Sequence, residues 1–330
     1  MNPLRIAVVG AGTMGSHHAR VIADSPETEL VAIVDPAETA DAVAHRQHSR
    51  RVDTIEQLLA EDRPEAAIVA VPTSSHAEVA TRLLEAGIPV LIEKPIAAST
   101  EEAEALAAVA AAGNVPLAVG HVERFNPAVR ALRERLDHEE LGRVFQVHTR
   151  RLSPFPIRIG DTGVAFDLAT HDLDIMSMLG GKALRVSAEV DRRAHRSHED
   201  LLAATLRFDS GIIGLLEVNW LTPTKVRQLS VTGERGMLVV DYLNQHLTLF
   251  ENAHESESWQ TLDIFDGVTE GNVIRFAINR VEPLRAQLDA FVRLVRGDQS
   301  DSVDAAAGIN ALRLALAVLE SGSLGQTVTL

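Results

Sequence analysis

A helix-like stretch in the middle of the chain, FDLATHDLDIMSML (166–179), carries ionisable side chains among apolar ones. On a helix, Asp167, His171 and Asp174 are spaced i, i+4 and i+7, so they share one face. An imidazole titrates near neutral pH and is suited to accept a proton. A carboxylate one turn earlier can orient that imidazole or hold a neighbouring hydroxyl. This stripe predicts a cleft with acid–base chemistry.

A metal site is the alternative interpretation of the same stripe. It would offer one nitrogen ligand and carboxylates from two helix faces, without a second clustered histidine, which is a poor ligand set. We therefore expect no metal. Asp172 and Asp174 can instead cap, form ion pairs or face solvent.

The N-terminal stretch VVGAGTMGSHHA contains the spacing G-x-G-x-x-G directly after a strand-like run. Gly10 permits a tight turn, Gly12 leaves room for a pyrophosphate, and Gly15 lets helix and strand approach closely. The following helix N-terminus offers N–H donors to phosphates. The motif predicts a dinucleotide site that includes Thr13 and Met14.

An acidic residue lies where such a site needs one. Asp35 follows Gly15 by 20 residues, at the end of the second strand-like run. Its carboxylate can accept from both ribose hydroxyls and would repel a 2′-phosphate, so NAD is favoured over NADP. A structural glycine turn with a solvated Asp35 is the alternative. His17 and His18, just after the motif, are interpreted as ordinary helix residues.

Two further strand ends carry polar residues. Ligands of parallel sheets lie outside the carboxyl ends of the strands, so Pro72, Thr73 and His76 are expected to border the cofactor. For His76, a plain surface position is an equal alternative. Glu93 and Lys94 end another apolar run, and lysine rarely ends a core strand without a partner.

The elements that position these residues fall into two patterns. Up to about residue 120, apolar strands alternate with amphipathic helices, which predicts a parallel sheet covered on both faces. The expected strands are 4–10, 29–35, 65–72, 89–95 and 116–121, and the expected helices are 13–24, 75–87 and 101–113, the last with Thr100 as N-cap.

After about residue 122, runs of alternating polarity predict a mostly antiparallel sheet. The expected strands are 143–152, 185–193, 201–208, 211–220, 226–233, 236–242 and 246–250, followed by helices 283–296 and 303–321. We therefore predict an α/β protein. A Rossmann domain (1–121) precedes an α+β domain (122–330) with a large open sheet for substrate binding and oligomerisation.

Composition narrows the function classes. The 330 residues carry a net charge of −15 and no cysteine. The charge opposes nucleic acid or an anionic membrane as partner. No apolar run approaches the roughly 20 residues of a membrane span, and the N-terminus lacks signal-peptide features. A cytoplasmic protein is expected.

Three motifs, taken together and in this order along the chain, resemble those of one family: G-x-G-x-x-G, E-K-P at 93–95, and D-x-x-x-H at 167–171. They are similar to those of the Gfo/Idh/MocA oxidoreductases over essentially the whole chain. The resemblance implies a catalytic Lys94 and a Glu93 near the nicotinamide riboside. It also implies a homodimer or homotetramer through the C-terminal sheet. The Lys94–Pro95 bond is a candidate cis peptide, because X-Pro bonds adopt cis at low cost.

The implied chemistry assigns roles to the stripe. Oxidising a secondary alcohol removes a hydride from carbon and a proton from oxygen, and the hydride chemistry belongs to the nicotinamide. His171 suits the proton, Lys94 can stabilise alkoxide character, and Asp167 can orient His171. Whether Lys94 or His171 takes the proton stays open.

The substrate is expected to be a sugar or nucleotide sugar. In the family, the region of Arg124, Phe125 and Asn126 borders the substrate. The segment RRLSPFPIRIGDTG (150–163) adds Arg150, Arg151 and Arg158, whose paired N–H donors suit a phosphate or carboxylate. A basic surface loop is the alternative.

These segments also resemble the family branch that contains UDP-N-acetylglucosamine 3-dehydrogenases. The resemblance favours oxidation at C3 of a UDP-linked amino sugar. An inositol or free-sugar dehydrogenase and a non-catalytic NAD(H) sensor are the alternatives, and the cofactor could also be regenerated within the site without release.

Overall fold

The chain folds into two compact units. The computed structural model describes residues 2–156, 162–194, 197–253 and 270–330. Unit 1 contains Met1–Phe125 and Glu282–Arg313, and unit 2 contains Asn126–Val281 and Leu314–Leu330. The sequence pattern predicts a boundary after residue 121, and unit 1 of the structure runs to Phe125 before it resumes at Glu282. Residues 282–313 differ, because they pack with unit 1 although the sequence pattern assigns them to the second domain.

Unit 1 is built on a parallel sheet. In the described part of the chain it has six strands in the order β3-β2-β1-β4-β5-β6, all parallel. The strands are β1 (Leu4–Val9), β2 (Thr28–Val34), β3 (Arg50–Val52), β4 (Ala66–Val69), β5 (Val90–Ile92) and β6 (Leu117–Val119). Every residue of β4, β5 and β6 is buried, as expected of a sheet covered on both faces.

Helices and short helical turns connect these strands, and one more turn, η3, follows the last strand. They are α1 (Thr13–Ala23), η1 (Glu38–Ala40), α2 (Asp41–Arg46), α3 (Ile55–Glu61), η2 (Thr73–Ser75), α4 (His76–Glu85), α5 (Thr100–Gly113) and η3 (Val122–Phe125). The expected N-cap of α5 is off by one residue. Ser99 caps the helix by accepting from the Glu102 N–H at 3.2 Å, and Thr100 is the first helical residue.

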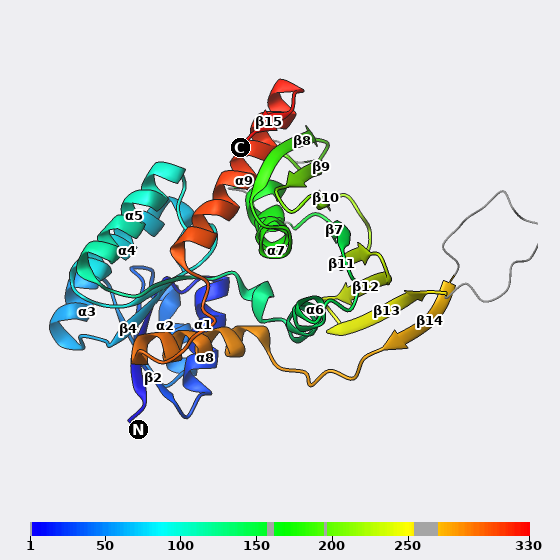
Figure 1. Ribbon diagram of the computed structural model, residues 1–330. Helices are drawn as coiled ribbons and strands as arrows, with labels where there is room; N and C mark the ends of the chain where they lie inside the picture. Colours follow the sequence, from blue (N-terminus) through cyan, green and yellow to red (C-terminus); the bar gives the residue numbers. More distant parts are fainter. Residues whose placement is uncertain (1, 157–161, 195–196, 254–269) are drawn as a thin grey trace, which may run out of the picture. The chain divides into compact units, whose positions relative to one another are not determined.

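The helix α8 (Pro283–Arg296) explains why the end of the chain belongs to unit 1. Its apolar face contributes Leu284, Leu288 and Phe291 to the core that also holds β1, β2 and β4. In Figure 1, α8 (orange) lies beside α1 (blue), and the two helices are in contact. A buried parallel sheet needs cover on both faces, and α8 supplies part of that cover.

Unit 2 is a mostly antiparallel sheet. Its order in the described residues is β14-β13-β12-β11-β7-β10-β9-β8-β15, and only the β7–β10 pair among them is parallel. The strands are β7 (Val144–Leu152), β8 (Ala183–Asp191), β9 (Leu201–Phe208), β10 (Ile213–Asn219), β11 (Val226–Gly233), β12 (Gly236–Asp241), β13 (His246–Asn252), β14 (Glu270–Arg275) and β15 (Val328–Thr329). This confirms the predicted fold class.

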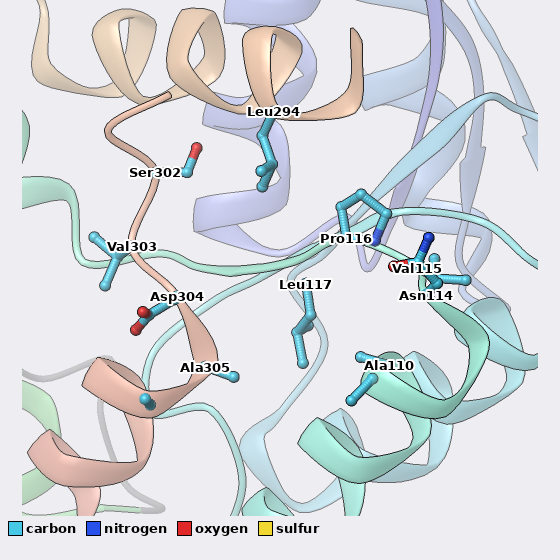
Figure 2. A pocket seen from close by; sticks show the side chains of 12 residues that line it. Ala110, Asn114, Val115, Pro116, Leu117, Leu294, Ser302, Val303, Asp304 and Ala305 are labelled. Atoms are coloured by element: carbon cyan, nitrogen blue, oxygen red, sulfur yellow. The ribbon is translucent and has the colours of Figure 1, made fainter. Parts of the chain in front are cut away.

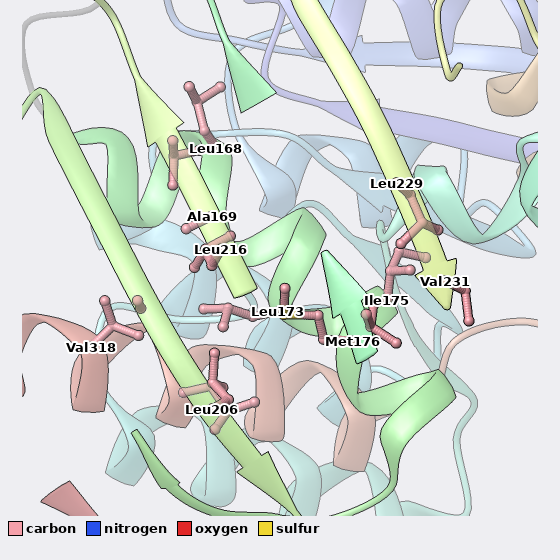
Figure 3. Packing of buried hydrophobic residues seen from close by; sticks show 14 of the residues in the cluster. Leu168, Ala169, Leu173, Ile175, Met176, Leu206, Leu216, Leu229, Val231 and Val318 are labelled. Carbon is pink, nitrogen blue, oxygen red and sulfur yellow. The ribbon is translucent and has the colours of Figure 1, made fainter. Parts of the chain in front are cut away.

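One face of this sheet is buried under helices. They are α6 (Pro127–Asp137), the π-helical turn η4 (Ala165–Ala169), α7 (Thr170–Gly180) and the end of α9 (Ala305–Leu324). Figure 3 shows Leu173 and Met176 of α7 packed among strand residues such as Leu206 and Leu216. Side chains alternate along the strands, and the opposite face is half-exposed.

The helix α9 corrects one expectation from composition. It has 20 residues, and among the described helices it is long and apolar enough to cross a membrane. However, Leu314, Ala315 and Val318 belong to the core of unit 2. A buried core helix passes the same length and composition test, so α9 is interpreted as a core helix.

Candidate active site

The glycine loop joins β1 to α1. Gly10 has φ +98°, and a Cβ there would lie 2.6 Å from the Ala70 carbonyl oxygen. A Cβ on Gly15 would lie 1.8 Å from the Gly10 oxygen, whereas one on Gly12 would meet nothing within 4 Å. Two glycines are therefore required by the fold, and the third leaves open space before the exposed Thr13 and Met14. This geometry suits a pyrophosphate at the start of α1.

Asp35 lies at the carboxyl end of β2 and faces this loop. Its Oδ2 accepts from the Ala11 N–H at 2.8 Å and its Oδ1 from the Ala37 N–H at 2.9 Å. Each carboxylate oxygen has further acceptor capacity, so ribose hydroxyls can still bind there. Arg51 lies nearby and donates to the Asp35 carbonyl at 3.0 Å.

Arg51 is a cation that the sequence reasoning did not consider. An arginine beside the adenosine ribose can accommodate a 2′-phosphate. Here Arg51 forms ion pairs with Asp41 and Asp53, so two carboxylates offset its charge. The site as a whole keeps the acidic character that favours NAD.

Glu93 and Lys94 follow β5, as predicted. The Glu93 carboxylate is buried, and its Oε1 lies 2.6 Å from His18 Nε2 of α1. Its Oε2 accepts from the Lys94 N–H at 3.2 Å. Burial by itself would raise the pKa of Glu93. The hydrogen bond from His18 and the charges of His18 and Lys94 outweigh burial, so the pKa lies below its ordinary value. Glu93 is therefore a carboxylate at neutral pH.

The sequence reasoning missed His18. The sequence pattern predicts an ordinary helix residue at this position, but His18 is 1% exposed and hydrogen-bonded to Glu93. The available signal was its position three residues after Gly15, because Gly15 packs against β1 and residues i and i+3 share a helix face. The Lys94–Pro95 bond is cis, which confirms that expectation.

His76 is buried too, instead of lying on the surface or reaching outward to a ligand. Its Nδ1 lies 2.8 Å from the Pro95 carbonyl oxygen, and its Nε2 lies 3.0 Å from that of Val71. Burial lowers the pKa of His76, although the two carbonyls oppose that effect. The ring therefore packs between the segment after β4 and the segment after β5, and when neutral it donates its one N–H to one of the two carbonyls. Pro72 and Thr73 lie on the former segment.

In unit 2, Asp167 and His171 lie on successive turns, but the first turn is π-helical. Asp167 belongs to η4 and His171 to the first turn of α7, and both are half-buried. The π-turn was not predicted, and such turns are frequent at functional sites. Asp174, the third member of the predicted stripe, is only 2% exposed. In the described ranges, no group of three or more His, Asp or Glu side chains could hold a metal ion.

The arginines that the sequence predicts to bind substrate do not form one cluster. Arg151 is buried and forms a bidentate ion pair with Asp172 of α7. Its Nε lies 2.7 Å from one carboxylate oxygen, and its Nη2 lies 3.1 Å from the other. Arg150 points to the opposite face of β7, where its Nε lies 2.8 Å from Glu217 Oε2. Strand alternation therefore prevents the two from acting together. Arg158 lies outside the described residues.

The two remaining predicted substrate residues lie at the junction of η3 and α6. Asn126 is 2% exposed. Its Oδ1 caps α6 by accepting from the Ala128 N–H at 3.1 Å, and its Nδ2 donates to the Tyr242 carbonyl at 3.1 Å. These contacts give Asn126 a structural role in unit 2. Arg124 is half-exposed on η3 in unit 1.

A separate hollow of about 420 Å³ lies in unit 1 between α5, α8 and the start of α9. Figure 2 shows small and apolar side chains around it, including Ala110, Leu117 and Val303. Leu117 begins β6, so this hollow lies at the amino end of the sheet. Ligands of parallel sheets bind at the carboxyl ends, and the hollow is therefore not the cofactor site.

Known proteins match the chain along most of its length. A family model for an oxidoreductase family with an NAD-binding Rossmann fold matches residues 4–121, and the GFO/IDH/MocA C-terminal domain model matches residues 129–239. The UDP-N-acetylglucosamine 3-dehydrogenase of Acidithiobacillus ferrooxidans is 30% identical over 322 residues, 96% of each chain. Its solved structure has a TM-score of 0.86 to this chain at 28% identity, covering 97% and 98% of the two chains. An inositol 2-dehydrogenase of Paenarthrobacter aurescens is 28% identical over 336 residues, 97% of this chain and 96% of that one.

Proposed function

Because the chain belongs to the Gfo/Idh/MocA family of oxidoreductases, we propose that it oxidises the C3 hydroxyl of a UDP-linked amino sugar to a ketone. The coarser function is established by the family: an NAD-dependent dehydrogenase acting on a CH–OH group. Similarity to a UDP-N-acetylglucosamine 3-dehydrogenase over nearly the whole of both chains supports the finer substrate.

The residues that would hold NAD fit its parts. The glycine loop with Thr13 and Met14 would receive the pyrophosphate, and Asp35 would accept hydrogen bonds from the adenosine ribose. Pro72, Thr73 and Glu93 border the remainder at the carboxyl ends of β4 and β5. Bound there, NAD would supply the acceptor for the hydride that leaves the sugar carbon.

The chain's own residues handle the hydroxyl proton. Lys94 donates a hydrogen bond to the reacting oxygen and stabilises its developing negative charge. His171 takes the proton, since an imidazole is the side chain suited to acid–base chemistry near neutral pH, and Asp167 orients the imidazole. Lys94 is the alternative proton acceptor. A kcat pH profile that loses an ionisation in His171→Asn would assign the proton to His171.

An inositol or free-sugar dehydrogenase is the second candidate. One observation favours it: Arg150 and Arg151 bind carboxylates of the chain itself, which weakens the argument for a diphosphate-binding cluster. Of the three arginines predicted to bind a phosphate or carboxylate, only Arg158 is then left, and it lies outside the described residues. An inositol 2-dehydrogenase is also among the similar proteins.

The experiment is NADH formation, followed by absorbance, with purified protein and NAD⁺. The panel contains UDP-N-acetylglucosamine, its uronic acid, glucose, glucose 6-phosphate and myo-inositol, each with and without 2-oxoglutarate as second oxidant. Turnover confined to UDP-sugars supports the proposal. Turnover of inositol or glucose contradicts it and favours the second candidate. Product formed only with 2-oxoglutarate indicates a cofactor that is regenerated without release.

The catalytic assignment has its own test, which also addresses a non-catalytic NAD(H) sensor. Lys94→Ala and His171→Ala should each lower kcat by about two orders of magnitude or more while NAD binding persists. Lys182→Ala is a matched control on a turn of unit 2. Near-normal turnover in both site variants would contradict the assignment. Wild-type binding of NAD without any turnover would favour the sensor.

We also propose a homodimer or homotetramer formed through the open face of the unit 2 sheet. That face carries half-exposed Leu215 and Val239, and Ile213 is 37% exposed. Leu215→Arg should lower the mass measured by light scattering. Leu243→Arg, on an exposed turn, should leave it unchanged.

The remaining partner predictions follow from charge. A net charge of −15 disfavours nucleic acid and anionic membranes as partners. As a separate proposal, we place the protein in the cytoplasm.

A further inference from the structure

Two buried histidines hold the Glu93–Pro95 segment from two sides. His18 projects from α1 and contacts the Glu93 carboxylate at 2.6 Å. His76 begins α4 and lies 2.8 Å from the Pro95 carbonyl oxygen. Both residues are 1% exposed. Lys94 is the residue between these two contacts, and it is half-buried.

The Glu93 carboxylate has little freedom to move. One oxygen faces His18, and the other accepts from the Lys94 N–H at 3.2 Å. A Cβ on Gly120 would already lie 3.1 Å from the carboxyl carbon, so the backbone after β6 closes another side. Because the Lys94 N–H donates to this carboxylate, a carboxylate that cannot move also holds the backbone of Lys94 in place.

His18 also connects this carboxylate to the glycine loop. It lies on α1, and the first turn of α1 contains Thr13 to Gly15 of the loop. A helix is a rigid element over one turn, so the phosphate-binding N-terminus and His18 move together. Binding of a pyrophosphate at the start of α1 would therefore fix the contact that orders Lys94.

We propose that His18 and His76 are positioning residues for Lys94, and that His18 couples the position of Lys94 to cofactor binding at the glycine loop. This inference rests on the proposed function for the role of Lys94. Neither histidine touches substrate. Each keeps the backbone from which the long Lys94 side chain extends in one place, and a displacement of about 1 Å can cost about 100-fold in rate.

The first experiment compares His18→Gln, which retains an N–H donor, with His18→Asn, which is too short to reach Glu93. His17→Gln is the matched control, because His17 is exposed on the same helix. In His18→Asn, kcat should fall about 10- to 100-fold, with the KM for sugar within about threefold. His18→Gln should recover most of the loss, and His17→Gln should match the wild type.

A purely structural role for His18 predicts a different result. Both His18 variants would then lower the melting temperature, while folded protein assayed below it would keep a kcat within about twofold of the wild type. That outcome would overturn the proposal. His76→Gln tests the second contact in the same way, with exposed His45→Gln as control.

A second measurement needs no substrate. The lysines of the chain are Lys94, Lys182 and Lys225. Reductive dimethylation with ¹³C-formaldehyde and a borane reductant therefore gives a simple methyl NMR spectrum, and Lys94→Arg assigns the Lys94 signal. Adding NAD⁺ should shift the Lys94 signal in the wild type and in His17→Gln. In His18→Asn that response should be lost or strongly reduced, while Lys182 and Lys225 stay unchanged.

The two measurements separate the failure of each proposal. If Lys94 responds to NAD⁺ equally in the wild type and in His18→Asn, the positioning role is wrong whatever the substrate is. If the response depends on His18 but no sugar in the panel is oxidised, the positioning role stands and the proposed substrate is wrong.

Discussion

At the scale of single residues, the chain uses the same side-chain types for structure and for chemistry. His18 and His76 are buried among bonds to a carboxylate and to carbonyls, whereas His171 is half-buried on a helix. The two aspartates of the segment H-D-L-D also lie in the interior. Asp172 forms an ion pair with a buried arginine, and Asp174 is itself buried. Residue type alone does not separate these roles, because burial depends on the rest of the fold.

The cofactor preference can be tested at Asp35. Asp35→Ser removes the charge that repels a 2′-phosphate but keeps a hydroxyl for the loop. We expect NADP to bind about tenfold or more better relative to NAD, because Arg51 nearby can then meet the phosphate. Titration of both cofactors measures this. Glu38→Ser, on the exposed η1, is the control, and unchanged selectivity in Asp35→Ser would contradict the assignment.

Arg151 was expected to bind substrate, but its fork onto Asp172 indicates a structural role. Arg151→Met leaves a buried carboxylate without this partner and should lower the free energy of unfolding by about 3–5 kcal/mol. Arg151→Met combined with Asp172→Leu should recover much of that loss in urea titrations. If the folded double variant shows a large rise in KM for the nucleotide sugar, Arg151 binds substrate after all.

Buried ionisable groups predict how stability depends on pH. Burial holds the pKa of His76 below its ordinary value of 6.5. As the pH falls, His76 is therefore protonated at a higher pH in the unfolded chain than in the folded protein. The free energy of unfolding should therefore fall as the pH drops below about 6.5. The lowered pKa of Glu93 also stabilises the folded protein. That contribution is lost as the pH falls through the pKa of Glu93 in the folded state.

The His76 contribution is measured by difference. Urea midpoints at about pH 7.5 and about pH 5.5 should differ less in His76→Gln than in the wild type. Equal differences in the two proteins would show that His76 does not contribute.

At the scale of elements, the helix that carries Asp167 and His171 begins with an unusual cap. Glu199, which precedes β9, accepts from the Ala165 N–H at 2.9 Å through its side chain and from the Val164 N–H at 3.1 Å through its carbonyl. A negative charge at a helix N-terminus is favourable. Glu199 therefore fixes the π-helical turn that holds Asp167.

Removing this cap should affect stability and rate together. We expect Glu199→Ala to cost about 0.5–2 kcal/mol in the free energy of unfolding and to lower kcat, while Glu199→Gln keeps an acceptor and stays close to the wild type. Denaturation and steady-state assays measure both. Glu189→Ala, on the exposed part of β8, is the control. An unaffected kcat in a destabilised Glu199→Ala would show that η4 does not depend on this contact.

At the scale of the whole molecule, α8 completes the N-terminal sheet. Leu284, Leu288 and Phe291 are buried in its core, and each contributes roughly 1.5–3 kcal/mol. A domain is only about 5–15 kcal/mol stable. A fragment of residues 2–125 should therefore fail to fold cooperatively, whereas the same residues joined to 282–313 by a short glycine-rich linker should fold and bind NAD.

Circular dichroism melting and NAD titration of the two fragments test this division. Fusion of 2–125 to residues 301–313, which lacks α8, is the matched control. Cooperative melting of 2–125 alone would show that α8 is dispensable.

The sequence by itself determined the features that depend on local order. The glycine spacing, the apolar strands and the alternating strands predicted a Rossmann sheet followed by an antiparallel sheet, because periodicity reflects which faces are buried. Asp35, Glu93 and Lys94 were located correctly at strand ends for the same reason.

Only the tertiary structure decided what the buried polar residues contact. The bond between His18 and Glu93, the fork of Arg151 onto Asp172 and the return of α8 to the first sheet each join segments far apart in the chain. Periodicity shows that a residue faces inward, but the partner it meets there depends on how distant elements pack.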